Sequence, residues 1–251
     1  MSIRNRVGLY LLAAGLAGVL SLLLVPFEEI APDTGIPPLV LRAVSIIQPA
    51  ILMLLFVLVG NALAPRVGLQ APLVQALAGG RPGLPVLRSQ IGPAIAGAAA
   101  VALVLTAYSR IVVPPMLEAS EGEAFARLLA HGPPLVTKLL YGGITEELIT
   151  RWGLVSLLAW LGWRLTHRQS EVRPGAFWSA IVIAAVIFAA AHLPLLFALL
   201  AEPPWWAITA VMLGNALPGV IFGWLFWKRG IEAAMIAHAL AHALATAIQY
   251  F

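Results

Sequence analysis

Residues 177–200 read FWSAIVIAAVIFAAAHLPLLFALL, a stretch without Asp, Glu, Lys or Arg. About 20 apolar residues form a helix long enough to cross the hydrocarbon core of a bilayer. Further apolar runs of similar length lie at 7–25, 39–63, 91–113, 135–163, 205–227 and 231–250. The sequence therefore predicts an all-α, polytopic transmembrane helical bundle of about seven spans.

The overall composition supports a membrane protein. Hydrophobic residues make up 61% of the 251-residue chain and charged residues only 10%, against roughly 25% charged in a soluble domain. The spans and their short loops use up the chain, so we expect one integral membrane domain over residues 1–251. The absence of cysteine excludes disulfides, thiolate metal sites and cysteine nucleophiles. The net charge of +4 comes from short loops without interleaved aromatic residues, which argues against a nucleic-acid partner.

Loop charges predict the orientation of the chain. Alternate loops are basic, and the loops between them are mainly acidic. The basic residues are Arg4, Arg6, Arg66, Arg81, Arg88, Arg164, Arg168, Arg173, Lys228 and Arg229, and the acidic ones are Glu28, Glu29, Asp33, Glu118, Glu121, Glu123 and Glu202. Because Lys and Arg accumulate on the cytoplasmic side, we expect the N-terminus in the cytoplasm and the C-terminus outside.

Ionisable residues inside apolar spans are costly and mark candidate functional sites. The candidates are Glu146, Glu147, Arg151, His192, His238 and His242. Glu147 and Arg151 are four residues apart, a spacing that places them on one helical face as an ion pair. Glu146 is rotated by about 100° from Glu147 in an α-helix, so it is expected to stay unpaired. Taken alone, Glu147 and Arg151 are better explained as a structural ion pair without any catalytic role.

The histidines occupy two other spans. His238 and His242 share a helical face by their spacing of four, as do Phe188 and His192. The helical rise places Glu146 and the three histidines at similar depth, so we expect them to meet in one polar site. Taken alone, His192 is better explained as a packing residue, and Phe188 as part of the core.

Such a site has the groups that hydrolysis needs. A carboxylate and an imidazole that share one water form a general base, and other imidazoles can donate hydrogen bonds to a developing oxyanion. This scheme requires no metal ion. The spacing alone does not distinguish hydrolysis from other chemistry.

Three motifs carry a resemblance to a known family. They are Glu146-Glu147-x-x-x-Arg151, Phe188-x-x-x-His192 and His238-x-x-x-His242. In this order on separate apolar segments, they resemble the CPBP family, which contains the CAAX prenyl endopeptidases and bacteriocin-processing or Abi-type intramembrane proteases. The resemblance covers about residues 135–250. We therefore divide the chain into variable N-terminal spans, 1–133, and a motif-bearing protease core, 134–251.

The resemblance implies a glutamic endopeptidase with defined residue roles. Glu146 and His192 would activate the attacking water, and His238 with the residue at 242 would form the oxyanion hole. Glu147, Arg151 and Phe188 would support the site.

The chain departs from the family at position 242, where His242 replaces the usual Asn. The imidazole can still donate a hydrogen bond, but its strength then depends on pH. The change also creates two histidines at the i,i+4 spacing of helical zinc ligands. We expect no cofactor, and a zinc site formed by Glu146, His192, His238 and His242 is the open alternative.

The resemblance implies an intramembrane endopeptidase in a bacterial inner membrane, CAAX-protease-like in type. Its partners would be the lipid bilayer and a membrane-embedded, lipid-modified or exported peptide. Two other functions stay open: a proton- or ion-coupled transporter, because intramembrane charges also mark ion pathways, and a non-catalytic scaffold of the same fold.

Overall fold

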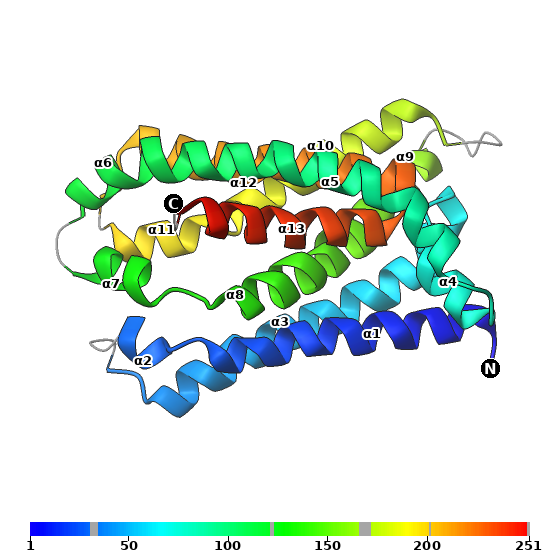
Figure 1. Ribbon diagram of the computed structural model, residues 1–251, viewed down its shortest axis with the longest axis horizontal. Coiled ribbons are helices and arrows are strands. Elements are labelled where there is room, and N and C mark those ends of the chain that lie inside the picture. The colour runs from blue at the N-terminus through cyan, green and yellow to red at the C-terminus, as the bar shows by residue number, and fades with distance from the viewer. Residues whose placement is uncertain (31–34, 121–122, 166–171, 201, 250–251) are drawn as a thin grey trace.

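The computed structural model of the protein describes residues 1–30, 35–120, 123–165, 172–200 and 202–249 (Figure 1). Within these residues every regular element is helical. The α-helices are α1 Ile3–Ser21, α2 Phe27–Ile30, α3 Pro38–Leu63, α4 Pro72–Ala78, α5 Leu84–Ala107, α6 Val113–Glu118, α7 Ala124–His131, α8 Leu135–Thr137, α9 Ser156–Leu165, α10 Pro174–Ala190, α11 Leu193–Leu199, α12 Trp205–Arg229 and α13 Ile231–Gln249. Short 3₁₀ segments are η1 Leu22–Leu24 and η2 Ala64–Val67, and π-type segments are η3 Tyr108–Val112, η4 Lys138–Glu146 and η5 Leu148–Val155.

The predicted helical membrane bundle is confirmed. Six helices of the described chain are long and apolar enough to cross a membrane: Ile3–Leu24, Leu39–Val67, Leu84–Glu118, Pro174–Leu199, Trp205–Arg229 and Ile231–Ile248. They run along the long axis of the molecule, and the two termini lie at opposite ends (Figure 1). α12, for example, is about 37 Å long at the usual helical rise, which exceeds the hydrocarbon thickness of about 30 Å.

The one predicted span that is not among these six helices is residues 135–163, the fourth along the chain. It forms the central helix of the bundle. It is helical from Leu135 to Leu165 through α8, η4, η5 and α9, without a break at Gly142 and Gly143. η4 packs against α1 and α13, and η5 packs against α3 and α10. Because neighbouring helices surround it, this segment can carry charged residues that a lipid-facing helix could not.

The local geometry of this central helix differs from the sequence prediction. An α-helix was expected, whereas η4 and η5 are π-type, with Glu147 between them. A π-helix has i→i+5 hydrogen bonds and therefore more residues per turn than an α-helix. The predicted rotation of about 100° between neighbouring residues is consequently too large here, and residues five apart lie closer together than expected.

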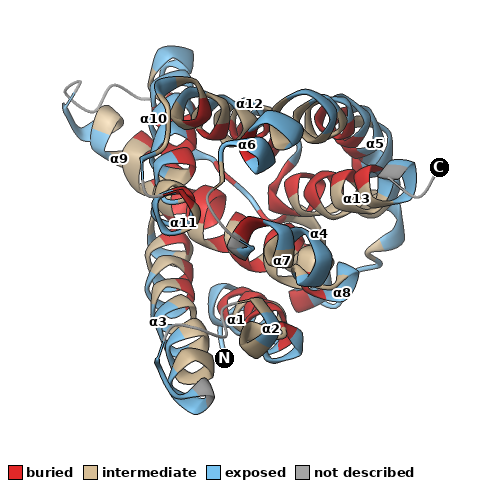
Figure 2. Cartoon of the chain, turned by 90° about the vertical axis from the view of Figure 1, so that its left-hand side faces the viewer, coloured by how far each residue is buried: buried red, intermediate tan, exposed pale blue. Residues whose placement is uncertain are grey.

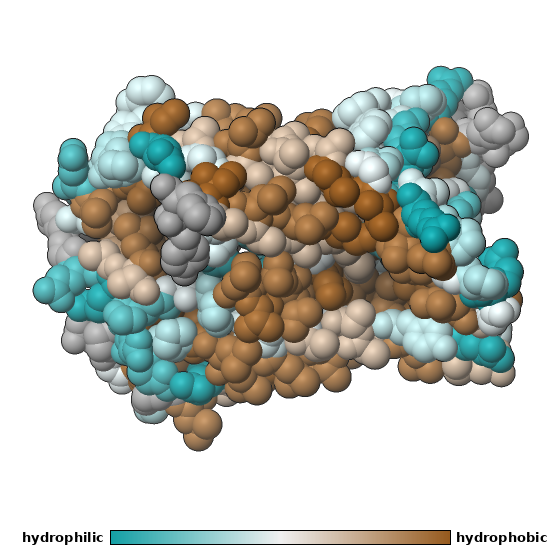
Figure 3. Space-filling view, viewed as in Figure 1, coloured by the Kyte–Doolittle hydropathy of each residue, from teal (hydrophilic) through white to brown (hydrophobic). Residues whose placement is uncertain are grey.

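The surface is divided into an apolar belt and two polar ends. Figure 3 shows hydrophobic residues around the middle of the molecule and hydrophilic residues at both ends of the long axis. Large exposed side chains of the belt include Leu55 and Leu58 on α3, Leu103 on α5, and Val186 and Ile187 on α10. Buried residues face the spaces between helices when the bundle is viewed from one end (Figure 2). This is the pattern of a protein that lipid surrounds.

Small residues bring the helices around η4 into close contact. A Cβ atom added at Gly143 would lie 2.8 Å from Cβ and 3.1 Å from Cα of Ala239 on α13. On the opposite side, Thr145 Oγ1 donates a hydrogen bond to the Gly15 carbonyl of α1 (2.9 Å), and Thr137 Oγ1 donates one to Ser21 (2.8 Å). η4 is therefore held between α1 and α13 by backbone proximity and hydrogen bonds, as expected for membrane helices.

We predict that Gly143→Ala lowers the midpoint of thermal unfolding in detergent, because the methyl group meets the backbone of α13. Overpacking of this kind costs about 1–3 kcal/mol. Gly92→Ala on α5 is the matched control, since an added Cβ has no neighbour within 4 Å there. Circular dichroism during heating measures both variants. Equal midpoints for the two variants would contradict the proposed backbone contact.

Candidate active site

Glu147 and Arg151 form the predicted ion pair in the centre of the bundle. Arg151 Nη1 lies 2.9 Å from Glu147 Oε1, and the side chains are 2% and 0% exposed. Arg151 also donates to the hydroxyl of Thr150 and, from Nη2, to the Gly219 carbonyl of α12 (3.1 Å). The ion pair thus joins η5 to α12.

Aromatic rings cover the guanidinium group of Arg151. Its Cζ atom lies 5.3 Å from the centroid of the Phe188 ring and 5.5 Å from that of Phe222. A cation over an aromatic face is attracted by the ring quadrupole. Phe188 therefore contacts a charged group as well as the core, which agrees with the supporting position expected for it.

The same carboxylate binds His238, a contact that the sequence did not predict. Nδ1 of His238 lies 2.8 Å from Glu147 Oε1. The His238 ring is stacked between Phe222 (4.5 Å between centroids) and His242 (5.0 Å). Glu147 thus binds Arg151 of its own helix and His238 of α13 at once.

The hydrogen bond to Glu147 determines which tautomer a neutral His238 adopts. A carboxylate only accepts hydrogen bonds, so the ring nitrogen of His238 that faces Glu147 carries a proton. Neutral His238 donates its Nδ1–H to Glu147, and its Nε2 then carries a lone pair. In this state His238 accepts a hydrogen bond at Nε2, and it donates one there only after protonation.

His242 lies beside His238 and faces a glycine. A methyl group added at Gly142 would be 3.1 Å from Nε2 of His242 and 3.6 Å from Nε2 of His238. Among the described residues, neither ring nitrogen of His242 has a hydrogen-bond partner. The absence of a side chain at Gly142 thus leaves space beside the Nε2 atoms of both rings.

Glu146 and His192 line one cavity of about 430 Å³ between α3, the central helix and α10. Other polar residues of its wall are Gln48, Tyr141 and Thr150. The Glu146 carboxylate forms no hydrogen bond or ion pair with the part of the chain that the structure describes. The predicted division between the two neighbouring acids is therefore found: Glu147 is paired, and Glu146 faces a cavity.

A break between α10 and α11 fixes the orientation of His192. Pro194 has no backbone N–H and disfavours a continuous helix, and α10 ends at Ala190. The backbone N–H of His192 bonds to Ala189, so the Phe188 carbonyl is free to accept from His192 Nδ1 (2.8 Å). Because a carbonyl only accepts, Nδ1 must carry the proton, which leaves Nε2 as a hydrogen-bond acceptor when His192 is neutral.

The structure thus brings the expected residues together in two pairs. Glu146 and His192 share the cavity, whereas His238 and His242 stack on each other and are not part of its wall. Gly142 and Glu146 belong to the same helix, η4, which connects the two pairs.

Three polar cavity residues, Gln48, Tyr141 and Thr150, were missed by the sequence analysis. Tyr141 is five residues before Glu146, a spacing that only a π-helix brings onto one side, so nothing in the α-helical period indicated it. Gln48 is a polar residue next to Pro49 within the apolar run 39–63. A polar side chain inside an apolar span is a signal that the sequence alone provides.

The alternative zinc site lacks a matching arrangement of ligands. Among the residues that the structure describes, no three His, Asp or Glu side chains are grouped so that they could hold a metal ion. Glu146, His192, His238 and His242 are all within this part of the chain, so they do not fit a tetrahedral zinc site.

Part of the chain matches a known protein family. Residues 130–244 match the family model described as Rce1-like, type II CAAX prenyl endopeptidase Rce1-like. The resemblance predicted from the three motifs is confirmed. The Rce1-like core, residues 130–244, covers a little under half of the chain and contains every predicted site residue. No curated protein and no solved structure matches the chain.

The family of the Rce1-like core suggests a CAAX-type intramembrane protease. This agrees with the membrane-spanning helices and with the buried polar site between them. The individual catalytic roles and the domain boundaries at 133 and 134 stay predictions.

The two neighbouring acids are predicted to differ in their effect on stability. Glu147→Gln leaves the buried Arg151 without a counter-charge, which costs about 3–5 kcal/mol. Glu146→Gln changes a side chain that has no partner in the described chain, so we expect a change within about 1 kcal/mol. Thermal unfolding in detergent measures both. Equal loss of stability in the two variants would contradict their different environments.

Proposed function

We propose that this protein is an intramembrane endopeptidase of the glutamic type, with Glu146 and His192 as the groups that activate water. The observation that carries the proposal is the cavity in which an unpaired carboxylate and an oriented imidazole occur together inside an apolar bundle. The match of the core to CAAX endopeptidases supports the same reaction class.

Hydrolysis begins with a water molecule between Glu146 and Nε2 of His192. The carboxylate removes a proton from this water. The water oxygen then forms a bond to the carbonyl carbon of the substrate. The resulting oxyanion accepts a hydrogen bond from neutral His242 of the imidazole pair. When the C–N bond breaks, the proton held by Glu146 is transferred to the leaving amine, which completes the reaction.

His242 is the better oxyanion donor of the imidazole pair. It can donate from a neutral ring, because neither of its nitrogens is occupied by a described residue. His238 must first be protonated, since Glu147 occupies its Nδ1. The family residue at position 242, Asn, supplies a neutral N–H donor, and neutral His242 can take the same part.

The cavity walls favour a substrate that comes from the membrane. Ile187 lines the cavity and is 48% exposed on the apolar belt, so the cavity reaches the lipid-facing surface between α3 and α10. His192 also borders a smaller apolar cavity of about 220 Å³, whose wall comes mainly from α6, α7, α11 and α12. Both features suit a membrane-anchored, lipid-modified or exported peptide.

The loop charges favour an orientation with the basic end in the cytoplasm. The N-terminus, α4 and the start of α5 lie at that end, and the C-terminus lies at the other (Figure 1). By the excess of Lys and Arg in cytoplasmic loops, the bundle would be placed in a bacterial inner membrane with its C-terminus outside.

We predict that Glu146→Gln abolishes cleavage without loss of the folded protein, because the amide cannot accept a proton from water. Protein termini are compared in membrane and secreted fractions of cells with the native chain, Glu146→Gln or the control Glu202→Gln, at equal expression. Glu202 is exposed and is not part of the cavity wall. A set of termini that disappears only in Glu146→Gln names the substrate.

Identical termini in all three strains would contradict the peptidase. Ion flux that depends on Glu146 in liposomes would then support the transporter, and a phenotype independent of Glu146 would support the scaffold. Once a substrate is known, cleavage by the purified protein is expected to persist in 1,10-phenanthroline, because the described ligands do not fit zinc. Loss of cleavage that zinc restores would overturn the metal-free scheme.

The proposed donor at position 242 is tested by two substitutions. His242→Asn keeps an N–H donor, so the cleavage rate should stay within about tenfold of the native rate. His242→Ala removes the donor, and loss of one oxyanion donor typically lowers kcat by about 10²–10³-fold. Cleavage kinetics on the identified substrate measure both. Similar rates for the two variants would exclude hydrogen-bond donation from this position.

A further inference from the structure

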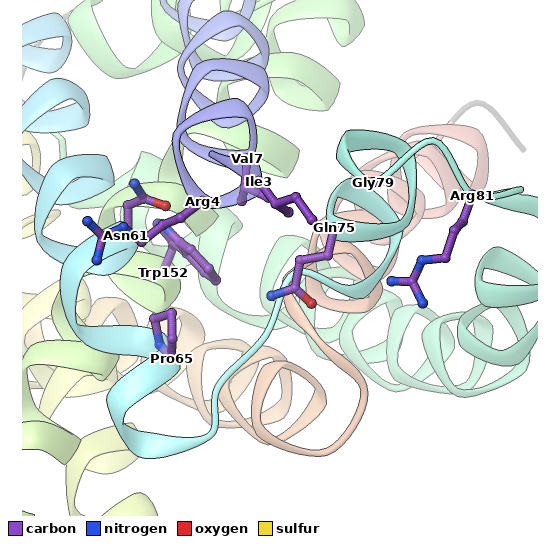
Figure 4. A pocket seen from close by; sticks show the side chains of 9 residues that line it. All are labelled: Ile3, Arg4, Val7, Asn61, Pro65, Gln75, Gly79, Arg81 and Trp152. Carbon is purple, nitrogen blue, oxygen red and sulfur yellow. The ribbon is translucent and has the colours of Figure 1, made fainter. Parts of the chain in front are cut away.

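A second polar cavity lies at the basic end of the bundle, separate from the cavity of Glu146 and His192. It has a volume of about 590 Å³ and is formed by the start of α1, the end of α3 with η2, α4, the following loop and one residue of η5 (Figure 4). Its polar side chains are Arg4, Asn61, Gln75, Arg81 and Trp152. None of these residues belongs to the proposed catalytic groups.

The cavity carries positive charge that the protein does not neutralise. The guanidinium groups of Arg4 and Arg81 form no ion pair or hydrogen bond within the described residues, and no acidic side chain belongs to the cavity wall. A neighbouring arginine, Arg6, is used differently: its Nη1 donates to the Ala78 carbonyl (3.2 Å) and joins α1 to α4. The site is therefore suited to an anion.

Trp152 contributes an aromatic side chain to the cavity wall. It is 1% exposed and lines the cavity, and its Nε1 is buried without a hydrogen-bond acceptor in the described structure. Figure 4 shows its ring between Pro65 and the side chains of Arg4 and Asn61. Because this nitrogen has almost no accessible surface and lies against Gly60 of α3, it is the face of the ring, and not its N–H, that borders the cavity.

The position of the cavity indicates where the anion comes from. Ile3, which lines the cavity, and Leu77 on α4 are 56% and 52% exposed, so apolar side chains lie beside the arginines. Hydrophilic residues gather at this end of the molecule, next to the apolar belt (Figure 3). Basic cavities between membrane helices at this level bind anionic lipid headgroups.

We propose that this cavity binds the phosphate group of an anionic phospholipid. Arg4 and Arg81 attract the phosphate, Asn61 and Gln75 provide amide N–H donors, and the acyl chains lie along the apolar surface of α1 and α4. The proposal rests on the contents of this cavity and not on the proteolytic mechanism.

The test measures binding of phosphatidylglycerol to the purified full-length protein in neutral detergent, by titration with a thermal-shift readout. Arg4→Gln/Arg81→Gln should weaken binding about tenfold or more, since each basic residue near an anionic lipid contributes about one kcal/mol. Arg66→Gln/Arg88→Gln removes the same charge from exposed positions of the same end and should have an effect below about threefold. Arg4→Lys/Arg81→Lys should restore most of the affinity.

Three further comparisons show which results would overturn the proposal. Equal effects of the two glutamine pairs would overturn the site, because the lipid would then respond only to general surface charge. Displacement of the lipid by millimolar inorganic phosphate would overturn the lipid assignment in favour of a soluble phosphate. Phosphatidylcholine that binds as tightly as phosphatidylglycerol would overturn the charge requirement. All four proteins are expected to unfold at similar temperatures without lipid, because the substituted side chains are exposed.

Discussion

The other parts of the site are arranged around the buried carboxylate of Glu147. It is fully buried and binds Arg151 and His238 through the same oxygen atom. Two charges inside an apolar bundle lose their hydration, so a buried pair persists only when further hydrogen bonds and close packing compensate. The Gly219 carbonyl and the rings of Phe188 and Phe222 provide this environment. One ion pair therefore specifies how η5, α10, α12 and α13 fit together.

The central helix directs neighbouring residues into three different environments. Glu146 faces the cavity that it shares with His192, Glu147 and Arg151 form the buried network, and Trp152 lines the cavity at the basic end. Such divergence over seven consecutive residues is possible because this helix is enclosed by others on several sides. The π-type turns add residues such as Tyr141 to the catalytic cavity that an α-helix would direct elsewhere.

Hydrogen bonds to the backbone and to Glu147 decide what each imidazole can do. His192 is oriented by a carbonyl that the end of α10 leaves free, and Pro194 is the cause of that end. His238 is oriented by a carboxylate, and His242 is left without such a partner in the described chain. Three histidines that look alike in the sequence therefore differ in which nitrogen can accept or donate a proton.

The sequence by itself determined the helical membrane fold, the ion pair of Glu147 and Arg151, and the resemblance of residues 130–244 to the Rce1-like family. These features follow from local physics: hydropathy over about 20 residues, and contacts between residues four apart on one helix. Only the tertiary structure decided that His238 binds Glu147, that Glu146 and His192 share a cavity without the other histidines, and that Arg4, Arg81 and Trp152 surround a second cavity. These contacts join residues far apart in the chain, and they depend on which helices pack together and on the π-type turns. Neither property appears in the spacing of the residues that form the contacts.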